Sequence, residues 1–375
     1  MAEPLRLCVV TWQLAPDSGW GRYSLGLVRG LAERGVRMTV LTERRSEPPD
    51  GVAAERIVPC LSTPLAALDR PKAFAWNLAQ VNRWSRGHDL VHFFVEPYAL
   101  ASSLAFVWPS VITVHGTYGV IPMKMNPVTR TFFGRAMNRA GSVVCVSRYT
   151  RDRVREVLPS ARLDVITNGF EALNRSAVED RESIEGSPVI LGVGALKPRK
   201  GYHVTVEAVA RLRKRFPGIH YYLVGDDQDV KYVTRLRDLV AELDLGRHVT
   251  ITGTIPDARL EALYRRCDAF VLTPISSGTA FEGFGLAYLE ANHYGKPVVG
   301  STDCGAEDAI EDGVNGRLAR PNDPDSVADC LTSVLEHPDL ATAMGERGRE
   351  RALARDWSTV AGEYLDVYRR VLAAS

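Results

Sequence analysis

Short apolar runs and helix-like segments alternate along the first half of the chain. Apolar runs and other strand candidates occur at residues 5–11, 38–42, 89–95, 110–115 and 143–147. Runs of this kind are typical of parallel strands that are buried on both faces. Residues 23–34 are helix-like and end at Gly35, and residues 148–158 predict another helix. This pattern predicts an α/β domain with a parallel sheet.

The same alternation begins again in the second half, after residues 171–187, which are rich in charge and have the composition of a linker. Further strands are predicted at residues 189–193, 221–225, 249–253, 269–273 and 297–300, and helices at residues 204–216, 260–266, 286–292 and 357–372. A chain of 375 residues exceeds the usual size of a single core. We therefore predict two domains, residues 1–170 and 188–355, followed by a C-terminal segment at 356–375.

Composition narrows the class of protein. With 45% hydrophobic and 24% charged residues the chain is ordinary globular material, and no apolar run approaches the roughly 20 residues of a membrane span. Nothing that reads as a signal peptide precedes the first strand, so we expect a cytoplasmic location. The six cysteines are scattered singly, which indicates neither a zinc site nor a disulfide framework.

The net charge of +1 conceals an asymmetry between the two halves. Residues 1–170 carry 21 Lys and Arg against 13 Asp and Glu, a net +8, whereas the remaining residues carry 25 against 32, a net −7. This suggests different partners for the two halves, and ordinary scatter of surface charge is the alternative. Residues 127–138 mix aromatic residues with arginines, which favours an amphipathic core helix, with contact to anionic lipid as the second interpretation.

Candidate chemistry is concentrated between Phe281 and Ser301 (FEGFGLAYLEANHYGKPVVGS). A turn with two glycines precedes a predicted helix, whose first N–H groups and positive dipole end suit a phosphate. The carboxylates of Glu282 and Glu290 lie on either side of this turn, where they can accept hydrogen bonds from the hydroxyls of a nucleotide-sugar. On the residues alone, an ordinary helix start with two solvated glutamates is an equal alternative.

Two further candidates follow predicted strands of the first domain, at the edge of the sheet where ligands bind. The first strand leads into a loop, residues 12–22, with Gly19-Trp20-Gly21, and no G-x-G-x-x-G follows it, which disfavours a dinucleotide-binding dehydrogenase. The strand at 110–115 ends in His115, followed by Gly116. For an isolated histidine a structural role is the more common one, and His92 has weaker context still.

Several blocks resemble glycosyltransferase family four. The pattern E-G-F-G-L-x₃-E followed by G-K-P-V-V resembles the E-x₇-E signature of that family, and the blocks T-V-H-G, V-I-T-N-G and G-A-L-K-P-R-K-G agree in order. The resemblance implies two Rossmann-like domains that face each other across a cleft (GT-B), with a C-terminal helix that crosses back to the first domain. It also implies a retaining, metal-independent hexosyltransferase, which moves a hexose from a nucleoside-diphosphate sugar to an acceptor hydroxyl.

The resemblance also assigns roles to single residues. The expected catalytic residues are His115, Glu282 and Lys200. The expected donor-binding residues are Gly19, Gly21, Arg199, Lys200, Gly283, Phe284, Gly285, Leu286 and Glu290. Glu290 would hold the ribose and Glu282 the transferred sugar. Ala195 stands where the family carries an arginine that clamps the diphosphate, so Lys197 or Arg199 is expected to replace it.

Two alternative functions and several partners are compatible with the same motifs. A nucleotide-sugar epimerase of the same architecture and a non-catalytic sugar-nucleotide binding subunit are the alternatives to a transferase. Expected partners are a UDP- or GDP-sugar donor and an acceptor that is a glycan, lipid-linked or a small molecule. We expect no metal, no cofactor and no nucleic acid, and we keep open a peripheral contact with the inner face of the membrane.

Overall fold

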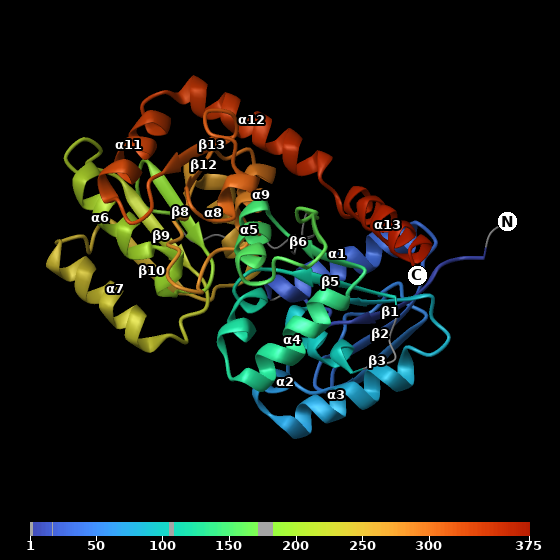
Figure 1. Ribbon diagram of the computed structural model, residues 1–375. Helices are drawn as coiled ribbons and strands as arrows, with labels where there is room; N and C mark the ends of the chain where they lie inside the picture. The colour runs from blue at the N-terminus through green and yellow to red at the C-terminus, as the bar shows by residue number, and fades with distance from the viewer. Residues whose placement is uncertain (1–2, 17, 105–108, 172–182) are drawn as a thin grey trace. The chain divides into compact units, whose positions relative to one another are not determined.

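The computed structural model describes residues 3–16, 18–104, 109–171 and 183–375 (Figure 1). The chain divides into two compact units. The first comprises Met1–Glu171 and Arg355–Ser375, and the second comprises Ala172–Ala354. Most of the predicted linker at 171–187 lies outside the described residues. Arg355 belongs to the first unit, where its carbonyl accepts a hydrogen bond from the backbone N–H of Phe170 at 2.8 Å.

The first unit contains a seven-stranded parallel sheet with the order β3-β2-β1-β4-β5-β6-β7. Its strands are β1 (Arg6–Val10), β2 (Arg37–Glu43), β3 (Arg56–Leu61), β4 (Leu90–Phe93), β5 (Ser110–Val114), β6 (Ser142–Cys145) and β7 (Leu163–Val165). Every residue of β4, β5 and β6 is buried, as expected for strands covered on both faces. The strand order reverses between β1 and β4.

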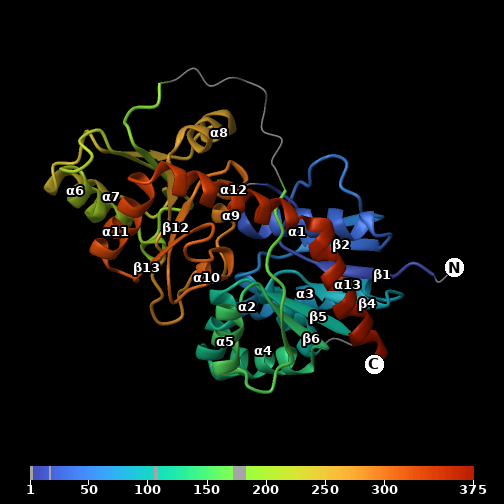
Figure 2. The ribbon, with the colours of Figure 1, turned by 90° about the horizontal axis from the view of Figure 1, so that it is seen from above.

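Helices cover this sheet on both sides. They are α1 (Gly19–Glu33), α2 (Ala66–Asp69), α3 (Pro71–Trp84), α4 (Pro127–Arg139), α5 (Arg148–Val157) and α13 (Trp357–Ala373), with short 3-10 helices η1 (Glu96–Ser103), η2 (Thr117–Gly119) and η3 (Ile121–Lys124). The C-terminal helix α13 packs against α1, and Figures 1 and 2 show it (red) beside the first unit. The contact is close because two α1 glycines, Gly26 and Gly30, face Trp357.

One prediction in this unit was wrong in detail, and another is confirmed. Helix α1 begins at Gly19 and not at Tyr23, because the Ser18 side chain caps it by accepting the N–H of Gly21 at 3.0 Å. The expected loop is shorter by four residues, and Gly19-Trp20-Gly21 forms the first turn of the helix. The segment 127–138 is a core helix, since Phe133 and Met137 of α4 are fully buried.

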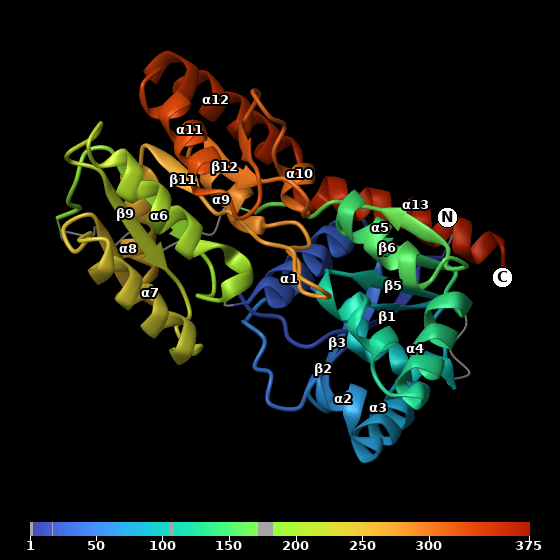
Figure 3. The same cartoon turned by 60° about the vertical axis from the view of Figure 1, so that its left-hand side comes forward.

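The second unit contains a six-stranded parallel sheet with the order β10-β9-β8-β11-β12-β13. Its strands are β8 (Val189–Val193), β9 (His220–Val224), β10 (Val249–Gly253), β11 (Ala269–Val271), β12 (Val298–Ser301) and β13 (Gly316–Ala319). Its helices are η4 (Pro198–Lys200), α6 (Tyr202–Leu212), α7 (Val230–Glu242), α8 (Asp257–Arg266), α9 (Leu286–His293), α10 (Ala306–Ala309), α11 (Pro324–Leu335) and α12 (Pro338–Ala354). Figure 3 shows the helices packed around this sheet.

Each unit is thus an α/β layer structure with a parallel sheet and crossover helices, which confirms the predicted fold class. In each sheet the carboxyl ends of the strands form one edge, and the loops that leave this edge carry the candidate residues. Within the described residues, no helix is long and apolar enough to cross a membrane.

Candidate functional site

Three predicted residues of the second unit form one charged cluster. The carboxylate oxygen Oε2 of Glu282 lies 2.7 Å from the Nη1 atom of Arg199 and 2.7 Å from the Nζ atom of Lys200. The side chains of Lys200 and Glu282 keep only 12% and 10% of their surface exposed, whereas that of Arg199 keeps 34%. One anion is therefore shared by two cations in a largely buried place, which leaves an excess of positive charge.

Burial and neighbouring charge compete in this cluster. Burial by itself would raise the pKa of Glu282, but the charges of Lys200 and Arg199 outweigh it and lower that pKa to about 2. Burial lowers the pKa of Lys200, while the Glu282 charge opposes that change. Glu282 is consequently ionised throughout the physiological range, so that it accepts hydrogen bonds and donates none.

The loop that carries both cations is fixed by the core of the second unit. It runs from β8 to α6, and Tyr202 donates a hydrogen bond from its hydroxyl to the carbonyl of Gly194 at 2.7 Å. At the other end, Gly201 has a φ of +72°, and a Cβ there would lie 1.8 Å from the carbonyl oxygen of Thr273. Only glycine fits both conditions. The loop is held at two points, which fixes where Arg199 and Lys200 leave the backbone.

Glu282 lies directly before the turn that leads into α9. Gly285 is the N-cap of this helix with a φ of +91°, and the backbone N–H of Gly305 donates to the carbonyl of Glu282 at 2.9 Å. A Cβ on Gly305 would lie 2.0 Å from the carbonyl oxygen of Gly283, so the two loops touch through their backbones. The predicted phosphate-binding residues, Gly283 to Leu286, thus follow directly on Glu282, which contacts both cations.

Glu290 lies on α9 and is buried, with 7% of its surface exposed. Its Oε2 atom accepts a hydrogen bond from the hydroxyl of Tyr264 on α8 at 2.9 Å. The ring of Tyr264 stacks on that of Tyr294 with centroids 5.3 Å apart. The alternative of two solvated glutamates is therefore wrong, since both carboxylates are buried and paired. A ribose contact for Glu290 stays a prediction.

In the first unit, His115 directly follows β5. Its Nε2 atom lies 2.7 Å from the carbonyl oxygen of Phe94, so Nε2 carries the hydrogen and Nδ1 is the acceptor of the ring. The ring of Tyr23 meets it edge-on, with centroids 4.4 Å apart. Burial lowers the pKa of His115 to about 4, against the hydrogen bond to Phe94, which raises it. His115 is thus a neutral, oriented imidazole at neutral pH.

His92, a weaker candidate, serves the core. It is fully buried on β4, where its Nδ1 and Nε2 atoms lie 2.7 Å from the Tyr368 hydroxyl and 2.8 Å from the Thr113 hydroxyl. The hydroxyls of Tyr364 and Tyr23 join the same network, so polar groups connect α13 to the sheet.

Sequence reasoning missed Glu96, the first residue of η1. This residue is fully buried, and its Oε1 atom accepts the backbone N–H of His115 at 3.2 Å. Burial raises the pKa of Glu96 to about 8, although backbone hydrogen bonds, including that from His115, lower it. Glu96 therefore holds a proton at neutral pH and supports the segment that carries His115. The only signal in the sequence was its place directly after a predicted strand.

Comparison with known proteins decides the family. The family model described as Glycosyltransferase Family 4 matches residues 18–172, and the one described as Glycosyl transferases group 1 matches residues 175–351. The GDP-mannose-dependent α-(1-6)-phosphatidylinositol monomannoside mannosyltransferase of Mycolicibacterium smegmatis is 32% identical over 275 residues, which cover 70% of this chain and 71% of that protein. The chain belongs to the family 4 glycosyltransferases.

Other similarities cover nearly the whole length of this glycosyltransferase. The glycogen synthase of Mycobacterium tuberculosis is 27% identical over 400 residues, which cover 97% of this chain and 94% of that protein. The structure of sucrose-phosphate synthase from Thermosynechococcus elongatus matches with a TM-score of 0.79 and 22% identity, over 99% of this chain and 100% of that one. The predicted GT-B fold and the predicted enzyme class, a nucleotide-sugar-dependent glycosyltransferase of the hexosyltransferase type, are confirmed.

Three predicted residues of the glycosyltransferase are positioned in ways that limit their roles. The packing of the first unit requires a glycine at position 21, because a Cβ there would lie 2.3 Å from the carbonyl oxygen of Ala15. Gly19 is exposed and would accept a side chain without contact. Lys197 is exposed, whereas Arg199 contacts Glu282, so the geometry favours Arg199 as the replacement for the clamp arginine.

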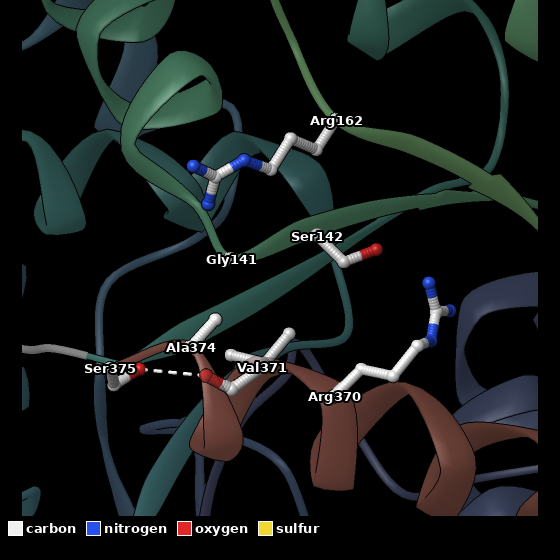
Figure 4. Close-up of a pocket in the computed structure, with 7 residues that line it drawn as sticks. All are labelled: Gly141, Ser142, Arg162, Arg370, Val371, Ala374 and Ser375. Carbon is white, nitrogen blue, oxygen red and sulfur yellow. Dashed lines mark hydrogen bonds between the residues drawn. The ribbon is translucent and has the colours of Figure 1, made fainter.

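A cavity of about 200 Å³ in the first unit lies apart from these residues (Figure 4). It is lined by Gly141, Ser142, Arg162, Arg370, Val371, Ala374 and Ser375. Two of its polar groups already serve Asp164, which accepts a hydrogen bond from Ser142 at 2.7 Å and pairs with Arg370 at 3.1 Å. It contains none of the predicted site residues. In the part of the chain that the structure describes, no group of three or more His, Cys, Asp and Glu side chains is placed to hold a metal ion.

Proposed function

We propose that this glycosyltransferase is a retaining hexosyltransferase that takes a hexose from a UDP- or GDP-linked donor and transfers it, without a metal ion, to an acceptor hydroxyl. The observation that carries the proposal is the convergence of Arg199 and Lys200 on one oxygen of Glu282, directly before the turn into α9. A diphosphate is a compact double anion, and this cluster combines two cations with the N-terminus of a helix.

The proposed roles follow from charge state and position. Lys200, Arg199 and the backbone of Gly283 to Leu286 bind the donor phosphates. Glu282, permanently ionised, accepts hydrogen bonds from the hydroxyls of the transferred hexose, and its Oε1 atom is the acceptor that the two cations do not occupy. Glu290 binds the ribose hydroxyls. Gly19, which has open space around its Cα at the start of α1, lets the donor approach the backbone there.

The reaction breaks the bond between the anomeric carbon and a phosphate oxygen and forms a bond from that carbon to the acceptor oxygen. Negative charge develops on the leaving diphosphate, where Lys200, Arg199 and the helix dipole stabilise it at no cost in reorganisation. The acceptor attacks on the same face, and its proton passes to the departing phosphate. These cations supply the charge that a divalent metal would otherwise provide.

His115 is proposed as the catalytic residue of the first unit. Because its ring is neutral and Nε2 is held by Phe94, Nδ1 can accept a hydrogen bond from a sugar hydroxyl. His115→Ala is expected to lower the transfer rate by at least tenfold while UDP or GDP still raises the melting temperature as in the wild type. An unchanged transfer rate would remove His115 from the proposal.

The name of a relative and the charge of the first unit indicate which donor and which acceptor to test first. The mycobacterial relative is named for GDP-mannose and a phosphatidylinositol mannoside, and the first unit here carries an excess of positive charge. On α4 the arginines and Val128, which is 64% exposed, lie on the solvent face. Cations beside an exposed apolar side chain support a peripheral contact of this unit with anionic lipid at the inner face of the membrane.

The test is a donor panel of UDP- and GDP-hexoses with and without acceptors. We expect loss of donor sugar to an acceptor, and Glu282→Ala and Glu282→Gln are expected to lower turnover by orders of magnitude with UDP or GDP binding retained. Isomerisation of the donor without an acceptor would indicate an epimerase, and binding without turnover would indicate a binding subunit. Near wild-type rates in both variants would remove the assignment of Glu282.

A further inference from the structure

Three aromatic side chains of the first unit meet at one edge of its sheet. Trp12 follows β1, Trp20 lies in the first turn of α1, and Tyr118 lies in η2 after β5. The ring centroids of Trp12 and Trp20 are 5.9 Å apart with planes at 88°, and those of Trp20 and Tyr118 are 5.5 Å apart with planes at 52°. We call these three residues the aromatic corner.

The aromatic corner lies where an open parallel sheet binds its ligands. The strand order reverses between β1 and β4, and ligands of such sheets lie outside the carboxyl ends of the strands at that reversal. The loops after β1 and β5 supply Trp12 and Tyr118. The same edge carries His115, three residues before Tyr118, and α1 supplies both Trp20 and the Tyr23 ring that packs on His115.

Exposure separates the aromatic corner from the core. All three of its residues are partly exposed, whereas Tyr23 and Phe94, which pack beside His115, are buried to 1% and 0% exposure. Exposed tryptophan and tyrosine offer a large, rigid surface that loses little conformational entropy on binding. A cluster that only completed the core would bury these rings as well.

The chemistry of a sugar ring fits such a surface. The face of an aromatic ring is electron-rich, and the C–H groups on one face of a pyranose are polarised by the neighbouring oxygens. Stacking therefore gains dispersion and a favourable electrostatic term while the sugar hydroxyls stay free for polar partners and water. A straight-chain alcohol or a phosphate offers no comparable flat apolar face.

We propose that the aromatic corner binds a pyranose ring of the acceptor, so that the acceptor is itself a glycoside or a glycan. The proposal rests on the proposed transferase function and specifies the class of acceptor. It also assigns a use to Trp20, which separates the two glycines of the first turn of α1.

The test observes the indole N–H signals of the ¹⁵N-labelled protein during titration to 100 mM with methyl glycosides of mannose, glucose and galactose, without donor. Signals are assigned with Trp12→Phe and Trp20→Phe, glycerol is the sugar-free control, and Trp76 on α3 is the internal control. We expect at least one glycoside to shift the Trp12 and Trp20 signals and to leave Trp76 unchanged. In Trp20→Leu the shift at Trp12 should fall at least fivefold, whereas Tyr118→Phe should retain most of it because the ring remains.

Two results would overturn the proposal: no glycoside moves either signal, or glycerol moves both as strongly. Donor binding is measured separately, as the rise in melting temperature on addition of UDP or GDP. If UDP and GDP do not raise the melting temperature of the wild-type protein, the proposed function is contradicted. If they raise it but no glycoside shifts the indole signals, only the proposal for the aromatic corner is contradicted.

Discussion

Two buried carboxyl groups of this glycosyltransferase have opposite protonation states, and their neighbours explain why. Glu282 has two cations at 2.7 Å, which lower its pKa to about 2. Glu96 lies in a fully buried place where its Oε1 atom accepts a backbone N–H, and burial raises its pKa to about 8. An ionised acid is suited to accept hydrogen bonds from a substrate, whereas a neutral one is suited to support a loop.

The lysines of the β8–α6 loop provide a matched pair of variants. Lys200→Met removes a buried charge from the proposed phosphate site, and we expect turnover to fall by about 10²–10³, as for other losses of one transition-state partner. Lys197→Met removes an exposed charge from the same loop and should stay within about twofold of wild type. Steady-state kinetics with a saturating donor measures both, and melting curves check folding. Equal effects of the two substitutions would contradict the assignment.

Glu96 predicts a dependence of stability on pH. Its pKa in the folded protein, about 8, lies above the unfolded value of about 4.3, so between these pH values only the folded state keeps the proton. The contribution of Glu96 to stability is thus full below about pH 4.3 and is lost as pH rises to 8, by at most about 1.4 kcal/mol per pH unit.

Glu96→Gln, which cannot ionise, should therefore gain stability relative to wild type between pH 5 and pH 8. Urea unfolding of both proteins at pH 5, 6.5 and 8 gives the difference. Other groups titrate equally in the two proteins and largely cancel. A difference that stays constant across this range would show that Glu96 is already ionised at pH 5.

Short sequence motifs predicted the site residues that lie within such motifs. They did not predict residues whose role depends on contacts with distant parts of the chain. Glu282 and Lys200 were predicted from their blocks, and the structure brings them together. The choice between Lys197 and Arg199 stayed open, because both cations lie in one loop, two positions apart, and the fold of that loop decides which side chain contacts Glu282. Glu96 could not be predicted, since its importance comes from a hydrogen bond to His115, 19 residues away.

At the scale of elements, capping and edge positions explain where prediction succeeded and failed. The strands β8 and β10 begin and end at the predicted residues, because each is an apolar run bounded by turn residues. Strand β3 was not predicted, since it lies at the edge of the sheet, is half exposed and contains Pro59. Helix α1 starts early because a serine cap, and not the following glycines, sets its first turn.

The packing of α13 on α1 depends on a glycine and is testable. A Cβ at Gly26 would lie 2.2 Å from the ring of Trp357, which is itself buried, so the ring cannot move aside. Gly26→Ala should lower the free energy of unfolding by about 1–3 kcal/mol, even though alanine favours a helix by about 1 kcal/mol. Gly19→Ala, in the same helix with open space around it, should not destabilise the protein. A thermal or urea melt compares the two, and a Gly26→Ala variant as stable as wild type would contradict this packing.

At the scale of the whole molecule, two units of the same layer architecture carry different chemistry. The second unit holds the cationic cluster and the start of α9, and the first holds a neutral histidine and an aromatic corner. Sequence rhythm predicted both sheets because buried parallel strands leave a strong apolar signal. The sequence also showed the difference in net charge between the two halves, for which different partners and ordinary scatter of surface charge are the two interpretations.

The proposed metal independence is tested on the intact enzyme. Because Lys200, Arg199 and the α9 dipole supply positive charge at the proposed phosphate site, we expect 5 mM EDTA to change the transfer rate by less than about twofold. Retention predicts that the product has the same anomeric configuration as the donor, which ¹H NMR of the product reads directly. Loss of activity with EDTA that Mg²⁺ or Mn²⁺ restores would refute the first expectation, and an inverted product would refute the second.

The most direct test of the central claim is a crystal structure of the protein soaked with UDP or GDP. The account predicts density for the diphosphate against the Lys200 ammonium and the backbone of Gly283 to Leu286, with Arg199 in contact. Clear density for the nucleotide at any other place, with the Glu282 cluster unchanged, would contradict it.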